Sequence, residues 1–379
     1  MPAAAARTSR RRSAAANPWP RAAPSAGAAE DARLAQRWTG AAMGWPVRDG
    51  VFEAGDVALR RGGVLRGARL VWRAHGTLAP ARDNVVLYPT SYGAQHPDLE
   101  WLIGPEGVLD PARWFIVIPN MFAGGLSSSP SNTADWPALV TAWDNVAAQR
   151  RLLERVFGVT RLHAVYGWSM GAQQAYHWGA AYPEAVARIV VNCGSARTSV
   201  HNRVFLKGMM AVLEAAPEYD GAALFSAPPA RALRAFGRLY AGWALSQDFY
   251  RAGLHLSALK APDLETFLRR DWEERFARRA AADLLAQMRT WEAGDIADDP
   301  RYGGDLARAL AAIEARVLLM PSETDLYFRV ADNAAELPHL KHGRLVPIPS
   351  IWGHRAGNPM ANPEDAAFLR REVRAFLES

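Results

Sequence analysis

The chain has 379 residues, of which half are hydrophobic and 22% are charged. This composition excludes an intrinsically disordered protein and suits one large domain, or a domain with an inserted part. The formal net charge is +6, but residues 1–37 hold seven of the 44 basic residues and only two of the 38 acidic ones. The remaining 37 basic and 36 acidic side chains nearly balance, which argues against a nucleic-acid-binding surface.

Residues 1–37 are rich in alanine, arginine, proline and serine and lack hydrophobic periodicity, so we expect them to form a disordered tail. The Ser-Arg-Arg-Arg run at 9–12 resembles the start of a twin-arginine export signal, but no long apolar stretch follows it. No later apolar run approaches the ~20 residues that span a bilayer, so we expect no membrane partner. The single cysteine, Cys193, favours a cytoplasmic location.

From about residue 50 the chain alternates segments typical of strands with segments typical of helices. Residues 51–76 have the pattern of two antiparallel strands with Gly62 and Gly63 at the turn. Short apolar runs bounded by Pro, Asn or Gly predict further, buried strands, and amphipathic or small-residue runs predict helices. The expected strands are 84–90, 114–120, 161–168, 186–194, 315–325 and 343–354, and the expected helices are 138–159, 170–183 and 363–379.

Residues 198–310 break this alternation, because they contain helical stretches rich in Met, Trp, Tyr and Arg but no run typical of a buried strand. Strands that alternate with helices imply an α/β architecture, with a mostly parallel central sheet flanked by helices. We therefore predict a core made of residues 48–197 and 311–379. Residues 198–310 are predicted to form an inserted helical cap, or lid, over the carboxyl edge of that sheet.

One short motif, Gly-Trp-Ser-Met-Gly at 167–171, lies between the expected strand 161–168 and the expected helix that follows it. In a nucleophile elbow the serine occupies a strained turn between a strand and a helix, and small residues are needed two positions before and after it. Gly167 and Gly171 meet that need. A serine before a helix is also a common N-cap, so the motif alone leaves both interpretations of Ser169 open.

A serine hydroxyl needs a base and an orienting carboxylate, and in this architecture they follow in the order Ser, Asp or Glu, His. Asp325 is the last residue of the expected segment 315–325, in the turn beyond its apolar part, with Glu323 close by as the alternative acid. His354 ends the last expected strand segment, 343–354, beyond its apolar part. Taken singly, Asp325 fits a helix cap and His354 fits an ordinary loop histidine. Their order after Ser169, at successive strand ends, instead predicts a catalytic triad of Ser169, Asp325 and His354.

Acyl transfer to a serine also needs two backbone N–H groups to stabilise the oxyanion. Met170, directly after the nucleophile, is expected to supply one. The second is expected from the loop after strand 84–90, with Thr90 as the first choice and Ser91 and Tyr92 as alternatives.

Five segments of the chain resemble the homoserine O-acetyltransferase-like branch of the α/β-hydrolase superfamily. The resemblance rests on "AHGTLAPARDNVVLYPTSYG", "RWFIVIPNMFAGGLSSSPSNT", "WDNVAAQRRLLERVFGV", "GWSMGAQQAYHWGAAYPEAVARIV" and "GHRAGNP", which follow in order across most of residues 50–375. It implies an α/β-hydrolase fold and an acyl-serine mechanism in which an acceptor resolves the acyl-enzyme. It also implies a homodimer through the cap.

Two departures from that branch bear on the acceptor. The transferases carry a glycine-rich stretch where this chain has "NMFAGGLSSSPSNT", and an aspartate after the catalytic histidine where this chain has Arg355. That aspartate is implied to hold the amino group of homoserine, so its replacement favours water as the acceptor.

Arg197, after a strand end, is a candidate for an anionic substrate group or a structural ion pair. Trp168, Tyr92 and Arg355 are further candidates for substrate binding.

The sequence thus predicts a serine esterase that acts on a small-molecule ester through an acyl-enzyme. One alternative is an acyl-CoA-dependent O-acyltransferase, with acetyl-CoA as co-substrate, and another is a non-catalytic binder of a small ligand on a hydrolase scaffold. No metal-ligand spacing, phosphate loop or dinucleotide fingerprint is found, so we expect no metal and no cofactor.

Overall fold

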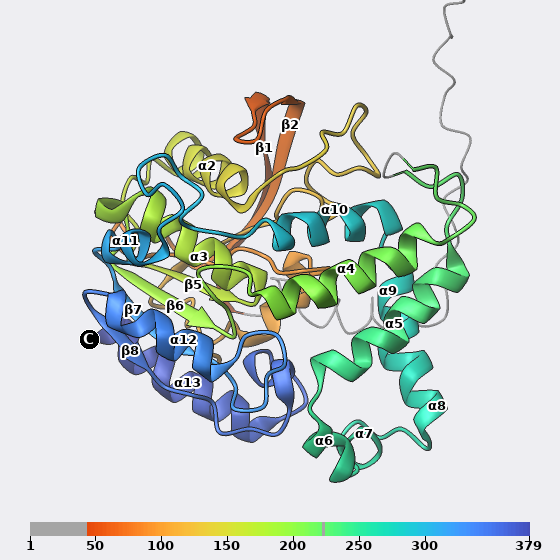
Figure 1. The fold of residues 1–379 in the computed structure, drawn as a ribbon. Coiled ribbons are helices and arrows are strands. Elements are labelled where there is room, and N and C mark those ends of the chain that lie inside the picture. Colours follow the sequence, from red (N-terminus) through yellow and green to blue (C-terminus); the bar gives the residue numbers. More distant parts are fainter. Residues whose placement is uncertain (1–43, 222–223) are drawn as a thin grey trace, which may run out of the picture. The chain divides into compact units, whose positions relative to one another are not determined.

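A computed structural model describes residues 44–221 and 224–379, so the tail predicted at 1–37 lies outside the described residues. Within them, eight strands form one sheet in the order β1-β2-β4-β3-β5-β6-β7-β8 (Figure 1). The strands are β1 (Val47–Ala58), β2 (Val64–His75), β3 (Val85–Leu87), β4 (Phe115–Pro119), β5 (Ala164–Trp168), β6 (Arg188–Asn192), β7 (Arg316–Met320) and β8 (Gly343–Leu345).

The strands run in the directions that the sequence pattern predicts. β1, β2 and β4 pair antiparallel, and every pair from β4 through β8 is parallel, which confirms the predicted mostly parallel sheet. All residues of β3, β4 and β5 are buried, as expected for apolar strands covered on both faces. β1 and β2 instead have many exposed residues among the buried ones, because they form the solvated edge of the sheet.

Two apolar clusters, one on each face, hold the helices against the sheet. One face packs on α2 (Ala142–Leu152), α3 (Met170–Ala181) and α11 (Leu306–Ala311) through Val85, Val165, Ile189 and Val317. The other face packs on α13 (Pro363–Glu378) through Val86, Ala164, Val190 and Leu318, and its cluster continues into the helices between β6 and β7.

In the described residues, seven α-helices lie between β6 and α11. They are α4 (Val200–Glu214), α5 (Ala230–Ala244), α6 (Gln247–Arg251), α7 (Leu254–Ser257), α8 (Leu264–Phe267), α9 (Glu274–Ala277) and α10 (Ala281–Glu292). In the described part of residues 198–310 there is no strand, only isolated bridges. Figure 1 shows α4, α5 and α9 on the side of the sheet toward which β6 points. The division into core and cap at 198 and 310 stays a prediction.

The inserted helices pack through aromatic side chains and one close backbone crossing. α5 buries Leu233, Phe236 and Tyr240 on one face and runs against the π-helical segment η6 (Leu268–Glu273). A Cβ on Gly237 would lie 2.7 Å from the carbonyl oxygen of Trp272, so only glycine permits this approach. No helix of the described chain is long and apolar enough to cross a membrane.

A buried carboxyl group connects α3, α12 (Val330–Glu336) and the loop after β6. Glu336 accepts hydrogen bonds from the Tyr176 hydroxyl at 2.7 Å, the Ala196 amide at 2.7 Å and the Asn333 side chain at 2.8 Å. Burial nevertheless raises the pKa of Glu336 to about 7, because the three donors only partly replace the lost hydration of the charge.

This carboxyl group makes the stability of the fold depend on pH. Because the folded state binds the Glu336 proton more tightly than an unfolded chain with the usual pKa of 4.5, its contribution is fully present below pH 4.5. That contribution is lost as the pH rises through about 7. Between pH 4.5 and about 7, the unfolding free energy of the wild type should fall by roughly 1–3 kcal/mol more than that of Glu336→Gln, which lacks the titrating group. Urea unfolding at several pH values measures this difference, and Glu323→Gln, which removes an exposed carboxylate, is the control. Parallel pH profiles for the wild type and Glu336→Gln would contradict the expectation.

Candidate active site

Ser169 lies at the junction between β5 and α3 with a strained backbone. Its φ is 58° and its ψ is −125°, a conformation that residues with a Cβ rarely adopt. The amide of Ser169 donates to the Asn192 carbonyl at 3.0 Å, and its own carbonyl accepts from Ala172 and Gln173 in the first turn of α3. Packing of the strand and the helix therefore maintains a backbone that would relax in a free peptide.

The small residues around Ser169 are required by close backbone approaches. A Cβ on Gly167 would lie 2.3 Å from the carbonyl oxygen of Gly171, and a Cβ on Gly171 would lie 2.7 Å from that of Pro89. Gly194, after β6, is equally crowded, because a Cβ there would meet the Ala172 side chain at 2.4 Å. The two glycines of the motif let strand, helix and neighbouring loop meet at the serine.

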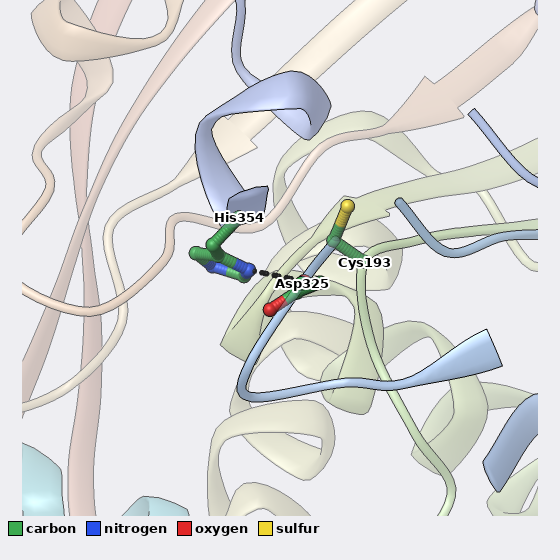
Figure 2. A group of neighbouring side chains, drawn as sticks. All are labelled: Cys193, Asp325 and His354. Atoms are coloured by element: carbon green, nitrogen blue, oxygen red, sulfur yellow. Dashed lines mark hydrogen bonds and ion pairs between the residues drawn. The ribbon is translucent and has the colours of Figure 1, made fainter. Parts of the chain in front are cut away.

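The structure brings Ser169, His354 and Asp325 into one hydrogen-bonded chain. His354 Nε2 lies 2.9 Å from Ser169 Oγ, and His354 Nδ1 lies 2.7 Å from Asp325 Oδ2. All three residues are at least 95% buried. Figure 2 shows the dashed contact between His354 and Asp325. The alternative acid, Glu323, is exposed, so the carboxylate that contacts the histidine is that of Asp325.

The loop after β7 orients the Asp325 carboxylate. Its second oxygen, Oδ1, accepts from the amides of Tyr327 at 2.8 Å and Phe328 at 3.3 Å, so both oxygens have partners. Three aromatic rings enclose the imidazole of His354. The ring centroid of Trp168, which stacks on the imidazole, lies 5.2 Å from that of His354, and those of Tyr327 and Phe328 lie 4.9 and 5.6 Å from it. These contacts fix the ring and exclude most water from the pair.

Cys193, directly after β6, lies beside Asp325 and His354 (Figure 2). Cys193, Asp325 and His354 form the one group in residues 44–221 and 224–379 whose potential metal-ligand atoms all lie within 4.8 Å. The Asp325 and His354 atoms are already hydrogen-bonded to each other. Burial raises the pKa of the Cys193 thiol well above its usual value, so the thiolate that a metal or a nucleophilic role requires is disfavoured.

The structure contradicts the choice of Thr90 as a donor to the oxyanion. The Thr90 amide donates to the Pro119 carbonyl at 3.3 Å, and its hydroxyl accepts from the Met121 amide at 2.9 Å. Ser91, one of the alternatives, lines the cavity at Ser169, and its amide has no hydrogen-bond acceptor among the described residues. Met170 is the first residue of α3, where an amide has no acceptor within the helix.

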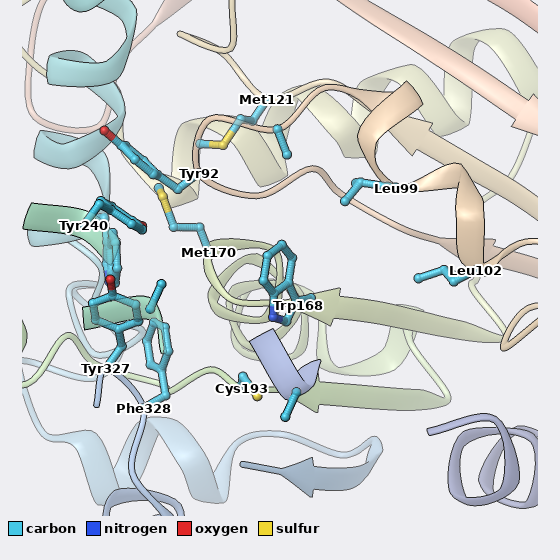
Figure 3. Packing of buried hydrophobic residues seen from close by; sticks show 14 of the residues in the cluster. Tyr92, Leu99, Leu102, Met121, Trp168, Met170, Cys193, Tyr240, Tyr327 and Phe328 are labelled. Atoms are coloured by element: carbon cyan, nitrogen blue, oxygen red, sulfur yellow. The ribbon is translucent and has the colours of Figure 1, made fainter. Parts of the chain in front are cut away.

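A small cavity opens at Ser169 between the core and the inserted helices. Its volume is about 50 Å³, room for a few water molecules. Ser91, Gly93 and His354 line it from the core, and Tyr240, Trp272, Arg275, Phe276 and Arg279 line it from the inserted helices. Figure 3 shows Tyr92, Tyr240 and Tyr327 lying together near Met170, with ring centroids 5.8 Å apart for Tyr92–Tyr240 and for Tyr240–Tyr327.

The predicted substrate-binding residues divide into two groups. Trp168, Tyr92 and Arg355 line the cavity. Arg197 does not: its Nε donates to Asp295 at 2.8 Å and its Nη2 to the Gly304 carbonyl at 2.7 Å. The proposed contact between Arg197 and an anionic substrate is thus contradicted, and the ion-pair alternative is correct.

Sequence reasoning missed the cavity residues that the inserted helices contribute, among them Arg275 and Trp272. They belong to the stretch 269–280, which holds five arginines with no spacing that marks one of them for the cavity. Only the way in which the helices fold over the sheet selects them.

Comparison with known proteins agrees with this geometry. Residues 100–278 match the family described as alpha/beta hydrolase fold. A probable esterase of Corynebacterium glutamicum is 34% identical over 79% of this chain and 87% of that protein. An ethyl acetate hydrolase of Pseudomonas veronii is 33% identical over 80% of this chain and 88% of that protein. The solved structure of an acetylester hydrolase from Corynebacterium glutamicum has a TM-score of 0.83 at 31% identity, over 90% of this chain and 99% of that one.

More distant relatives include acyltransferases. A homoserine O-succinyltransferase of Azoarcus sp. is 28% identical over 76% of this chain and 84% of that protein. The resemblance inferred from the sequence segments is therefore confirmed. The eight-stranded sheet, the serine at the β5–α3 junction and these similarities together show that the chain belongs to the α/β-hydrolase family, in the branch that contains both esterases and homoserine O-acyltransferases.

Proposed function

We propose that the protein is a serine esterase that forms an acyl-enzyme at Ser169. The observation that carries the proposal is the hydrogen-bonded chain from Asp325 through His354 to Ser169 Oγ, held at a strained strand–helix junction. The similarity to a probable esterase, an ethyl acetate hydrolase and an acetylester hydrolase supports the proposal.

Each residue has a defined role in the proposed reaction. Ser169 Oγ attacks the ester carbonyl carbon as its proton passes to His354 Nε2, and Asp325 stabilises the imidazolium that forms. The amides of Met170 and Ser91 hold the negative charge that develops on the carbonyl oxygen. When the carbon–oxygen bond to the alcohol breaks, His354 returns the proton to the departing oxygen. A water molecule, deprotonated by the same histidine, then releases the acid.

The size of the cavity supports a short acyl group. A space of about 50 Å³ suits an acetyl group better than a long acyl chain. Two similar proteins, an ethyl acetate hydrolase and an acetylester hydrolase, are named for acetyl esters. We therefore propose that the acyl part of the substrate is about as small as acetate.

An acyl-CoA-dependent O-acyltransferase is the alternative, and the similarity to homoserine O-succinyltransferases favours it. It would need acetyl-CoA as co-substrate. The position that the transferases fill with an acid next to the catalytic histidine is occupied by Arg355, which repels an amino group. The esterase therefore explains this site better. A non-catalytic binder would have no use for the Ser169–His354–Asp325 arrangement.

Location and assembly are further parts of the proposal. The single cysteine supports a cytoplasmic location, and the family resemblance supports a homodimer through the helices of residues 198–310.

Replacement of Ser169 tests the nucleophile. We expect Ser169→Ala to lower kcat for p-nitrophenyl acetate by about four to six orders of magnitude and to abolish fluorophosphonate labelling, because no other group supplies the attacking oxygen. The exposed Ser226→Ala, a matched control, should keep both activities. If wild type and Ser169→Ala are equally inactive and unlabelled, the protein is not a serine esterase.

Replacement of the acid tests the orienting role of Asp325. Asp325→Asn keeps the shape of the side chain but stabilises the wrong tautomer of His354, so we expect kcat to fall by about four orders of magnitude. Glu323→Gln removes a neighbouring exposed carboxylate and should leave kcat within about twofold of wild type. Retained activity in Asp325→Asn with loss in Glu323→Gln would transfer the acid role to Glu323.

Competition between acceptors separates the two enzyme classes. With acetyl-CoA or p-nitrophenyl acetate as donor and homoserine, serine or simple alcohols as acceptors, we expect acetate to be the main product, because Arg355 disfavours an amino-acid acceptor. Product analysis by mass spectrometry measures acetate and O-acetyl ester together. Ester formation that exceeds hydrolysis and depends on the acceptor would instead identify an O-acyltransferase.

A further inference from the structure

Among the described residues, three arginines line the cavity at Ser169 and no aspartate or glutamate does. Arg275 belongs to α9, Arg279 follows it, and Arg355 lies in the 3-10 helix η8 (Gly353–Gly357), directly after the catalytic histidine. A cavity whose charged lining residues are all arginines favours negatively charged ligands.

Only one of the three charges is neutralised by the protein. Arg279 donates from Nε to the Gly93 carbonyl at 2.8 Å and from Nη2 to Asp98 at 2.6 Å. The guanidinium groups of Arg275 and Arg355, by contrast, have no hydrogen bond and no ion pair with any residue of 44–221 or 224–379. Partly buried guanidinium groups without an acceptor are costly, because each loses hydration and gains no protein oxygen in return.

The two unpaired cations also act on each other. Burial first and the charge of Arg275 second lower the pKa of Arg355 to about 10, so Arg355 remains charged near neutral pH. Asp271 and Tyr250 face Arg355 and act in the opposite direction. Asp271 is itself paired with Arg270 at 2.8 Å and does not cancel the excess. The cavity therefore keeps unneutralised positive charge beside the nucleophile.

Two neutral donors of residues that line the cavity also have no acceptor among the described residues. The indole N–H groups of Trp168 and Trp272 are buried and have no acceptor, although both residues line the cavity. A ligand that brings acceptor oxygens would satisfy donors that the protein leaves open. Such an excess of donors over acceptors is expected where an anion completes the site.

We infer that Arg275 and Arg355 recognise a carboxylate on the substrate, so that the natural substrate is a small anionic ester. This inference rests on the proposed esterase function and adds the chemical class of the substrate. Guanidinium groups bind carboxylates through two parallel hydrogen bonds, and a planar carboxylate suits the small cavity better than a tetrahedral phosphate.

Two pairs of esters of matched size test the inference on both sides of the scissile bond. For the alcohol side the pair is 4-acetoxybenzoate and 4-acetoxybenzamide, and for the acyl side it is the monoethyl ester of succinate and ethyl butyrate. We expect the charged member of at least one pair to have a kcat/KM at least tenfold higher. In addition, benzoate should inhibit p-nitrophenyl acetate hydrolysis by the wild type more strongly than benzamide does.

Charge-removing variants assign the preference to the two arginines. Arg275→Gln and Arg355→Gln should each lower the charged-to-uncharged ratio of kcat/KM at least fivefold. Arg269→Gln, which removes an exposed arginine outside the cavity wall, should keep the wild-type ratio. Circular dichroism checks that each variant is folded.

The outcomes separate the two levels of the argument. Hydrolysis of the uncharged esters without any preference for the charged ones, or a preference that persists in both cavity variants, overturns the inference and leaves the esterase function standing. A wild-type protein that hydrolyses none of the four esters overturns the esterase function, and the inference fails with it.

Discussion

The strained backbone of Ser169 is the constraint on which the rest of the site depends. A residue with a Cβ keeps φ at 58° only because β5 and α3 are pressed together on either side of it, and Gly167 and Gly171 make that approach sterically allowed. The same turn brings Oγ within 2.9 Å of His354 Nε2 at the carboxyl end of β5 and places the Met170 amide at the start of α3. One packing arrangement thus positions both the proposed nucleophile, Ser169, and one proposed donor to the oxyanion, the Met170 amide.

The other parts of the site come from neighbouring strand ends and are fixed by packing of the inserted helices. Asp325 follows β7, and its loop amides hold the carboxylate toward His354. Gly353, just before the histidine, has a φ of 60°, and a Cβ there would lie 2.9 Å from the Ser246 amide. The loop that carries the base is therefore in direct backbone contact with the end of α5.

The nucleophile motif, the order of acid and base and the parallel sheet could be predicted from the sequence, because each depends on local pattern and chain order. The hydrogen-bonding state of the loop amides after β3 could not be predicted, since it depends on which amide pairs with β4: the Thr90 amide does so and the Ser91 amide does not. Nor does sequence separate an arginine bound to Asp295, such as Arg197, from one left unpaired in the cavity, such as Arg275. That distinction arises only when segments far apart in the chain are packed together.

Formation of an acyl-enzyme at Ser169 is the central claim, and mass spectrometry tests it most directly. The protein is mixed with p-nitrophenyl acetate, quenched in acid during steady-state turnover, and its peptides are analysed. One acetyl group on the peptide that contains Ser169, present in the wild type and absent in Ser169→Ala, is the expected result. Turnover with no acetyl group on Ser169, or acetyl transfer to another residue such as Cys193, would contradict the mechanism.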